Sequence, residues 1–298
     1  MRFWIGMLFW AGVCFGEIVR YEPLSLDVWY QGRFYHAFRL LEESSAQSYL
    51  AFDHQTLQAQ KIPLQEAKIA PGAALEDSLY KKMMREAYKP PRLLANDGLK
   101  SFGGESHYLS VDLCPSRHKG FEERLWTLLE ARQKAFPVIV CVSGRWMDSH
   151  KEEWAALIQK ERQGSLEILW CNHTYDHFYE KNLPLERNFL RHESQNLSKE
   201  VLQLEKRWLK EGILPSPFFR FPGLISSPSL MQELQKLGLI PLGAQAWMAK
   251  GEIPQKGGII LLHGNLNEPL GIDLFERFLE ENQGAHFGGV KEMQKGLE

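Results

Sequence analysis

From residue 106 onward, short apolar segments alternate with longer segments that carry their apolar residues at helical spacing. The short segments have the length of buried strands, and the longer ones have the pattern of surface helices. Strands are expected at Tyr108–Asp112, Pro137–Ser143, Leu166–Cys171, Phe218–Arg220, Leu239–Ala244 and Ile259–His263. Helices are expected at Gly120–Lys134, Trp146–Lys160, Leu197–Glu211, Ser229–Lys236 and Asp273–Asn282. This alternation predicts an α/β fold with a parallel sheet covered by helices, either a barrel or a doubly wound sheet.

Residues 17–88 have a different pattern. Two segments alternate apolar and polar residues as half-buried strands do, Asp27–Phe38 and Ser48–Asp53, and Gln31-Gly32 is a candidate turn inside the first. A helical stretch follows at Leu75–Ala87. We therefore expect a small α+β region of unknown role at residues 17–88, a linker at the Pro- and Gly-rich residues 89–105, and the main domain at residues 106–290.

The first sixteen residues, MRFWIGMLFWAGVCFG, carry one positive charge at Arg2 and then an apolar run that ends at Gly16. The run is shorter than the roughly 18–20 residues that a spanning helix needs, and Glu17 and Arg20 follow at once. This pattern predicts a signal peptide at residues 1–16 and an exported protein, periplasmic or extracellular. A buried N-terminal strand or an uncleaved anchor are the alternatives. No later stretch is long and apolar enough to cross a membrane.

Composition narrows the function classes. The 298 residues are 44% hydrophobic, which is enough for a large buried core and excludes a wholly disordered chain. A formal charge of −2 gives no general electrostatic reason to bind nucleic acid. The sixteen-residue leader holds one of the four cysteines, and the remaining three are an odd number, so free thiols are favoured over a disulfide framework. The oligomeric state stays open.

Polar side chains stand at or just after the ends of four expected strands: Asp112, His173, Arg220 and His263. The carboxyl ends of parallel strands meet at one edge of the sheet, where α/β proteins build their sites. We therefore expect these four side chains to converge.

The segment CNHTYDH (171–177) places His173 and His177 four residues apart. On a helical turn, side chains at this spacing share a face, and two imidazoles there can bind one zinc ion. Thr174 stands where a metalloprotease helix has its catalytic glutamate, so a zinc protease is disfavoured. The alternative is two unrelated histidines.

The histidine segment is one of five motifs that follow one another along the chain. They are YLSVDLCPS (108–116), CVSGRW (141–146), CNHTYDH (171–177), FFRFPG (218–223) and IILLHGN (259–265). The series resembles the polysaccharide deacetylase family, also called the NodB-homology domain or carbohydrate esterase family 4, over a little more than half of the chain. The resemblance implies a distorted (β/α)7-type barrel with a small N-terminal appendage. It also implies an enzyme that removes acetyl groups from N-acetylated sugars, usually with a bound divalent metal, for which zinc is expected in this chain.

The resemblance assigns roles to the matching residues. Asp112 matches the catalytic base, His263 the general acid, and Arg220 the arginine that orients the base. His173 and His177 match the two metal-binding histidines. The expected substrate-binding residues are Pro222, Gly223, Leu261, Trp146 and Tyr175, of which Leu261 would shape the acetyl pocket and the aromatic residues would stack on sugar rings.

The sequence departs from the family in the opening motif and near residues 244–247. Its opening motif reads Asp-Leu-Cys-Pro, with Cys114 where glycine is usual, and resembles a recognisable branch of the family. The opening motif of the family has a second acid that binds the metal, whereas this chain has Leu113 there, which leaves two obvious protein ligands instead of three. We expect Glu122 to be the third ligand; Cys114 or His118, or a weakly held metal or none, are the alternatives. Near residues 244–247 the family has another acid, and this chain offers no obvious residue that would tune the pKa of His263.

The sequence therefore predicts a hydrolase that acts on the C–N amide bond of acetylated sugars in a polysaccharide or peptidoglycan. The alternatives are a carbohydrate-binding pseudoenzyme that has lost its metal because of Leu113, and a metal-independent hydrolase of a small amide.

Overall fold

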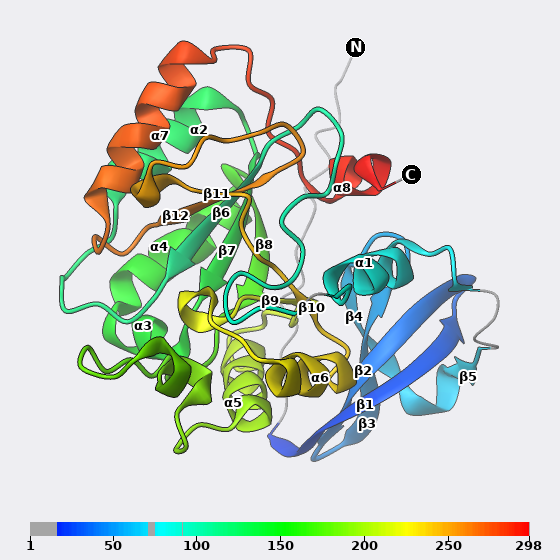
Figure 1. Ribbon diagram of the computed structural model, residues 1–298. Coiled ribbons are helices and arrows are strands. Elements are labelled where there is room, and N and C mark those ends of the chain that lie inside the picture. The colour runs from blue at the N-terminus through cyan, green and yellow to red at the C-terminus, as the bar shows by residue number, and fades with distance from the viewer. Residues whose placement is uncertain (1–16, 71–74, 91, 298) are drawn as a thin grey trace, which may run out of the picture.

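The computed structural model of the chain describes residues 17–70, 75–90 and 92–297 (Figure 1). The predicted signal peptide lies outside the described residues. In the described part, the chain forms two β-sheets, a parallel sheet built from residue 108 onward and a smaller antiparallel sheet built by the N-terminal region. The predicted α/β class, with a barrel-like parallel sheet and a small N-terminal appendage, is confirmed.

The parallel sheet has the strand order β10-β9-β8-β7-β6-β12-β11, and its neighbouring strands pair in parallel. Its members are β6 (Tyr108–Leu113), β7 (Phe136–Val142), β8 (Leu166–Asn172), β9 (Phe218–Phe219), β10 (Ile240–Pro241), β11 (Ala246–Trp247) and β12 (Ile259–His263). The helices that alternate with them are α2 (Glu123–Arg132), α3 (Gly144–Ser149), α4 (Lys151–Arg162), α5 (Leu197–Leu209), α6 (Pro228–Lys236), α7 (Pro269–Glu281) and α8 (Val290–Gly296).

Side chains on the strands alternate between two hydrophobic clusters. On β7, Val140 and Val142 belong to the outer cluster beneath the helices, whereas Ile139 and Cys141 belong to an inner cluster. On β6, Leu113 lies in the outer cluster with Trp126 of α2. Successive residues of a strand face opposite sides of the sheet, so this alternation turns Asp112 toward the inner side.

The structure differs from the expected elements in two ways. The expected helix Trp146–Lys160 is divided at His150, whose backbone (φ −128°, ψ 54°) is not helical and whose ring Nε2 lies 2.8 Å from the carbonyl oxygen of His118. The short strand β11 and helix α8 have patterns too brief for hydrophobic periodicity to detect. The other expected strands and helices are present, with ends that shift by a few residues.

The N-terminal sheet has the order β4-β3-β2-β1-β5, and its neighbouring strands are antiparallel. It consists of β1 (Ile18–Tyr30), β2 (Arg33–Glu43), β3 (Ala46–Asp53), β4 (Ala59–Pro63) and β5 (Lys68–Ile69), and helix α1 (Leu79–Ala87) packs beside it. The predicted turn at Gln31-Gly32 is confirmed. Both residues have positive φ, 45° and 82°, as a two-residue hairpin loop requires, and glycine adopts this conformation without strain.

The expected linker makes specific contacts with the parallel sheet. The backbone of Leu99 pairs with Pro241 and Gly243 beside β10, and the carbonyl of Lys100 accepts a hydrogen bond from Ile259 at the start of β12. Phe102 is fully buried. This stretch therefore connects the β10 side of the sheet to β12, although its composition resembles that of a linker. The division into domains stays a prediction.

The N-terminal sheet and the parallel sheet share one hydrophobic cluster, to which β2, α1, α5, α6 and β10 contribute. A buried ion pair crosses the same boundary. The Nε and Nη2 atoms of Arg39 on β2 each donate to the carboxylate of Glu205 on α5 at 2.7 Å, and the hydroxyl of Tyr21 donates to the same carboxylate. The two parts are thus packed as one body.

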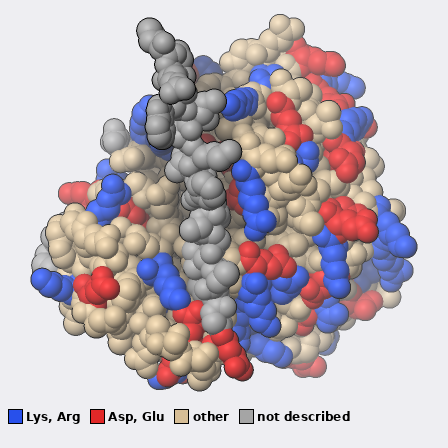
Figure 2. All heavy atoms as spheres, turned by 180° about the vertical axis from the view of Figure 1, so that it is seen from behind, with Lys and Arg blue, Asp and Glu red and all other residues tan. Residues whose placement is uncertain are grey.

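Charged side chains of both signs are interspersed on the rear face of the molecule (Figure 2). Among the described residues, no helix combines the length and the apolar character needed to cross a bilayer.

Candidate active site

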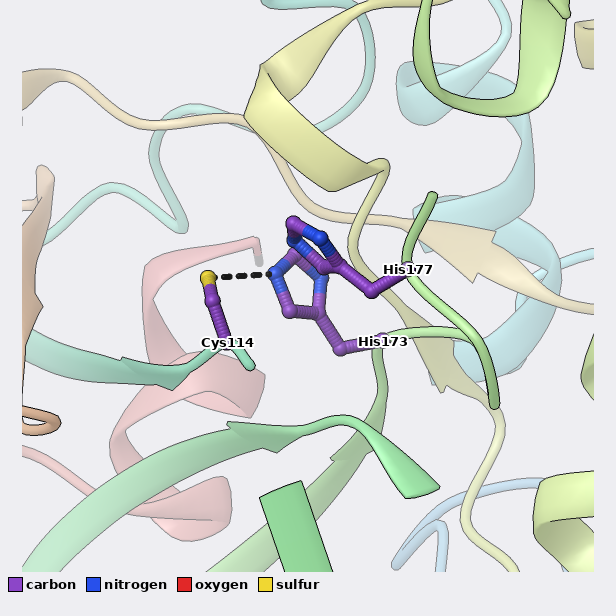
Figure 3. A group of neighbouring side chains, drawn as sticks. All are labelled: Cys114, His173 and His177. Carbon is purple, nitrogen blue, oxygen red and sulfur yellow. Dashed lines mark hydrogen bonds between the residues drawn. The ribbon is translucent and has the colours of Figure 1, made fainter. Parts of the chain in front are cut away.

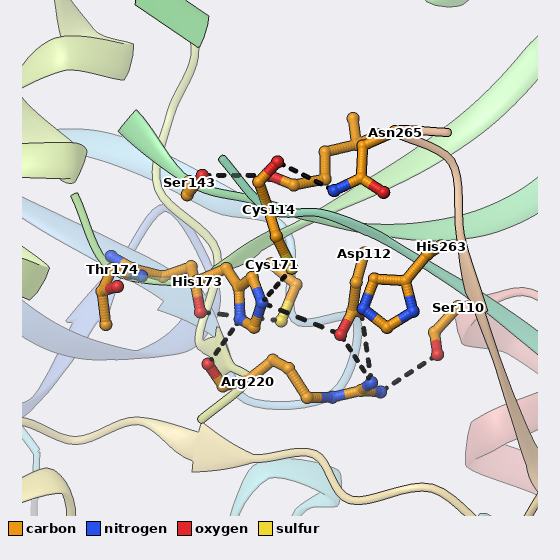
Figure 4. A network of polar contacts seen from close by, with 12 residues as sticks. Ser110, Asp112, Cys114, Ser143, Cys171, His173, Thr174, Arg220, His263 and Asn265 are labelled. Carbon is orange, nitrogen blue, oxygen red and sulfur yellow. Dashed lines mark hydrogen bonds and ion pairs between the residues drawn. The ribbon is translucent and has the colours of Figure 1, made fainter. Parts of the chain in front are cut away.

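The carboxyl ends of β6, β8, β9 and β12 bring four expected side chains together (Figure 4). The Asp112 carboxylate lies 3.2 Å from Nη1 of Arg220 and 3.8 Å from Nε2 of His173. His263 pairs with Asp112 in the register of β12 and β6, and its imidazole lies beside that carboxylate in Figure 4. Residues separated by about half of the chain therefore meet at one edge of the sheet.

Arg220 is fully buried and fixes the orientation of Asp112. Its Nη1 donates to both carboxylate oxygens, at 3.2 and 3.4 Å, while Nη2 donates to the hydroxyl of Ser110 and to the carbonyl of Gly243. Burial raises the pKa of Asp112, but Arg220 and the imidazoles of His173 and His263 outweigh burial, and the net pKa is lowered. Asp112 is therefore ionised and held in one position at neutral pH.

His173 and His177 lie side by side, with ring centroids 4.7 Å apart, but no helix holds them. They follow β8 in a loop in which Thr174 and His177 have positive φ, 67° and 47°. The side chain of Asn172 accepts a hydrogen bond from the Thr174 amide and supports this loop. The expectation of a helical turn is wrong, because the local hydrogen bond and the left-handed residues fold the segment back on itself instead.

The two imidazoles can hold a metal ion together with a third side chain. The possible ligand atoms of Cys114, His173 and His177 all lie within 4.8 Å of one another, and all three residues are buried. The Nδ1 atom of His173 donates to the Arg220 carbonyl at 2.8 Å, so Nε2 is the ring nitrogen that would bind an ion. The buried Nε2 atom of His177 has no hydrogen-bond partner among the described residues. Such an atom is costly unless something binds it, so these residues fit a metal ion.

Glu122, the expected third ligand, lies elsewhere. It precedes α2, its amide donates to the carbonyl of Gly264, and its carboxylate is 4.0 Å from Arg124. It does not belong to the group of ligand atoms around His173 and His177. The reason is that the turn after β6 carries Glu122 outward with the start of α2, while Cys114 stays at the end of the strand.

Glu268 is a partner of His263 that sequence reasoning missed. Its carboxylate oxygen lies 2.8 Å from Nδ1 of His263 and accepts a hydrogen bond from the indole of Trp247, also at 2.8 Å. Burial lowers the pKa of His263, but Cys114, Glu268 and Asp112 outweigh burial and raise it well above its ordinary value. The sequence did contain a signal for this residue. Glu268 lies five residues after His263 and directly before Pro269, and a proline at the first position of a helix marks the residue before it as the helix start.

An open cleft of about 1240 Å³ lies over this site. Cys114, His177 and His263 are at its base, Gly223 is in its wall, and the rings of Phe178, Tyr179 and Trp247 line it. Gly223 has a φ of +60°, and a Cβ atom there would come within 2.5 Å of the Phe189 ring, so the wall requires glycine at this position. Flat rings and polar groups in an open cleft suit a sugar chain.

The other expected substrate-binding residues lie partly near the cleft and partly away from it. Pro222 is buried next to Gly223, and Leu261 lies in a small apolar cluster with Leu224 and Ala244. Trp146 is fully buried beneath the helices and stacks on His150, so its expected contact with sugar is wrong. Tyr175 bonds to Asp148 and packs against Gly144, and it does not line the cleft. The sequence positions of these two aromatic residues are compatible with packing in the hydrophobic core as well as with lining the cleft.

The fold and the site define a class of protein: an α/β protein with a buried carboxylate, guanidinium and imidazoles at the carboxyl edge of a curled parallel sheet, below an open cleft. No family model matches the chain. The chain is similar to the solved structure of a family 4 carbohydrate esterase from Bacillus anthracis, with 15% identity and a TM-score of 0.48 over 77% of this chain and 95% of that one.

Two further solved structures are similar to it. One is a family 4 carbohydrate esterase from Streptomyces lividans in complex with acetate, with 16% identity and a TM-score of 0.44 over 65% of this chain and 96% of that one. The other is BA3943, a CE4 family pseudoenzyme from Bacillus anthracis, with 13% identity and a TM-score of 0.44 over 64% and 65% of the two chains.

Proposed function

We propose that this protein is a hydrolase that removes acetyl groups from N-acetylated sugars of a polysaccharide or peptidoglycan. The arrangement that carries the proposal is an ionised Asp112 clamped by Arg220, next to a histidine of raised pKa and two imidazoles suited to a metal, all at the base of one cleft. A base, an acid and a metal-binding pair are the groups that amide hydrolysis by water requires.

Asp112 is the general base of the proposed reaction. Its lowered pKa keeps it ionised, and the two hydrogen bonds from Arg220 aim it into the site. It accepts a proton from the water that attacks the acetyl carbonyl. Because Arg220 is buried and held by Ser110 and Gly243 as well, the base does not need to reorganise during the reaction.

His263 is the general acid. Its raised pKa keeps the ring protonated near neutral pH, and Glu268 orients the ring through Nδ1. The protonated ring donates to the nitrogen that leaves from the tetrahedral intermediate, which turns a poor leaving group into a neutral amine. Base and acid thus come from the neighbouring strands β6 and β12.

His173 and His177 would hold a divalent ion, and imidazole ligands favour zinc. When bound, such an ion supplies a Lewis acid that polarises the acetyl carbonyl and makes water more acidic. Apart from that ion, Gly223 and the rings of Phe178 and Trp247 would position the sugar within the cleft.

The decisive experiment measures acetate release by the purified chain from acetylated chito-oligosaccharides and from peptidoglycan. We expect release that stops on treatment with a chelator and returns when zinc is added. Activity that survives the chelator would support the metal-independent hydrolase instead, and its complete absence on all substrates would reject the enzyme.

A second candidate is a carbohydrate-binding protein without activity. The observation that favours it is Leu113, which is buried against Trp126 and offers no metal ligand. Such a protein would bind the same oligosaccharides without releasing acetate. Export to the periplasm or the cell surface is part of the proposal and depends on residues 1–16; fusion of these residues to a reporter that is active only outside the cytoplasm tests it.

A further inference from the structure

We propose that the Cys114 thiolate is the third protein ligand of the metal ion, so that one sulfur and two imidazole nitrogens form the centre. This inference rests on the proposed function, because it concerns the same site. In this arrangement the Cys114 sulfur takes the place of the carboxylate that Leu113 cannot supply.

The strand geometry selects Cys114 rather than its neighbour. Leu113 points outward from β6 into the cluster with Trp126, and Asp112 and Cys114, on either side of it, face the site. Asn265, which is fully buried, donates to the backbone carbonyl of Cys114 at 2.9 Å, and Ser143 donates to that of Leu113 at 3.0 Å. The end of the strand is therefore fixed with the sulfur directed at the histidines.

The distances match a shared ion. The Sγ atom of Cys114 lies 3.4 Å from Nε2 of His173, as Figure 3 shows. A sulfur and a nitrogen on one tetrahedral zinc ion, with bonds of about 2.3 and 2.0 Å, lie about 3.5 Å apart. The ring of His177 faces the same point, and its nitrogen belongs to the group within 4.8 Å.

The ring nitrogens that would bind the ion are those without a backbone partner. The carbonyl of Arg220 can only accept a hydrogen bond, so Nδ1 of His173 carries a proton, and Nε2, which faces the sulfur, is the nitrogen that would bind the ion. The Nε2 atom of His177 is buried and has no partner in the described part of the chain. Three protein ligands would leave the fourth position of a tetrahedral ion open, as catalytic zinc sites require.

The ligand set also selects the metal. A thiolate is a soft ligand and prefers zinc or cobalt, whereas magnesium, calcium and manganese prefer carboxylate and water oxygens. We therefore expect this chain to discriminate more strongly against manganese and magnesium than a site with a carboxylate in the same place.

Cobalt provides a direct test, because a thiolate bound to Co²⁺ gives a sulfur-to-metal charge-transfer absorption in the near ultraviolet, and imidazole or carboxylate ligands do not. The full chain is stripped with a chelator and titrated with Co²⁺, then with Zn²⁺ as competitor. We expect the absorption to saturate at one ion per chain and to disappear when zinc displaces cobalt.

Three variants locate the ligand. C114S removes the thiolate, and we expect it to lose the absorption and to bind zinc more than about 100-fold more weakly, since even partners outside the ligand set contribute 10–100-fold. C114D offers an oxygen ligand, so it should bind metal without the absorption and accept manganese more readily. C171A, which removes a different buried cysteine of the same sheet, should keep the absorption.

The proposal is overturned if the wild-type chain binds cobalt without the absorption, if it binds no metal at all, or if C114S keeps the wild-type affinity. Acetate release is measured separately on the same samples. A chain that shows the absorption but releases no acetate would reject the hydrolase and leave the ligand assignment intact, so the two failures are distinguishable.

Discussion

The carboxylate of Asp112 faces one guanidinium and two imidazoles in a fully buried site, and these neighbours determine its protonation. The sequence identified the four residues at the strand ends, because strand ends follow from hydrophobic patterning. It did not identify Glu268, and it favoured Glu122 over Cys114 as the third ligand, whereas the structure places Cys114 beside His173 and His177. Those contacts depend on where the turns after β6 and β12 lead, and nothing local in the sequence encodes these paths.

Replacing Asp112 by asparagine keeps the shape of the side chain but removes the proposed base. We expect kcat to fall by at least about 100-fold, the usual contribution of a general base. Oligosaccharide binding, measured by calorimetry, should be retained. The matched control is D273N, which removes an acid that also pairs with an arginine, Arg124, on the surface. Full activity of D112N would remove Asp112 from its role.

The pH dependence of kcat/KM should reflect the lowered pKa of Asp112 and the raised pKa of His263. In the proposed mechanism, activity needs Asp112 ionised and His263 protonated. The lowered pKa of Asp112 places the acid limb of kcat/KM below the ordinary carboxylate range, and the raised pKa of His263 places the alkaline limb above the ordinary histidine value of about 6.5.

The E268Q variant tests the source of the raised pKa of His263. Loss of the negative charge should move the alkaline limb to lower pH and leave the acid limb in place. E276Q, on the same helix but paired with Arg124, should leave both limbs unchanged. An alkaline limb that does not move in E268Q would show that Glu268 does not tune the acid.

At the scale of elements, β2 of the appendage and α5 of the main domain are connected by the fully buried pair of Arg39 and Glu205. The sequence predicted both elements but not their contact, since residues 39 and 205 are far apart in the chain. A charged residue on a strand or helix is usually exposed to solvent, so neither residue by itself indicated a buried pair. Tertiary packing brought the charges together and removed them from water.

The E205Q variant should be strongly destabilised, because it leaves a buried guanidinium without its counter-charge. Breaking a buried pair in this way costs about 3–5 kcal/mol, measured here as the free energy of unfolding in urea. The exposed pair of Arg20 and Glu22 provides the control, and E22Q should unfold like the wild type. Equal stability of E205Q and wild type would contradict the buried contact.

At the scale of the whole molecule, the shared hydrophobic cluster couples the N-terminal sheet to the parallel sheet, so acid sensitivity in one should affect both. Asp27 on β1 lies 2.6 Å from Nδ1 of His36, 3.1 Å from Nε2 of His54 and 3.3 Å from Nζ of Lys81. Burial alone would raise the pKa of Asp27. The hydrogen bonds from His36 and His54 and the charge of Lys81 lower it by more than burial raises it, so the net pKa is strongly depressed.

A depressed carboxyl pKa contributes stability that is present above the unfolded-state value of about 3.9 and is lost as the pH falls below it. We expect the wild type to lose stability progressively as the pH falls below about 4, because the unfolded chain then binds a proton at Asp27 that the folded protein does not. The D27N variant should be less stable at neutral pH and show a flatter profile in that range. D77N, at an exposed acid before α1, should keep the wild-type profile, and the same slope for D27N would contradict the role of Asp27.

The sequence by itself determined the α/β class, the order of the strands along the chain, the hairpin turn at Gln31-Gly32, and the polar residues at the strand ends. Hydrophobic periodicity and turn chemistry act over a few residues, so they are readable without coordinates. Only the tertiary structure decided that residues 95–102 join two sides of the sheet, that Trp146 belongs to the core, and that Cys114 and Glu268 reach the site. These are contacts between distant segments, and they depend on how the elements pack together.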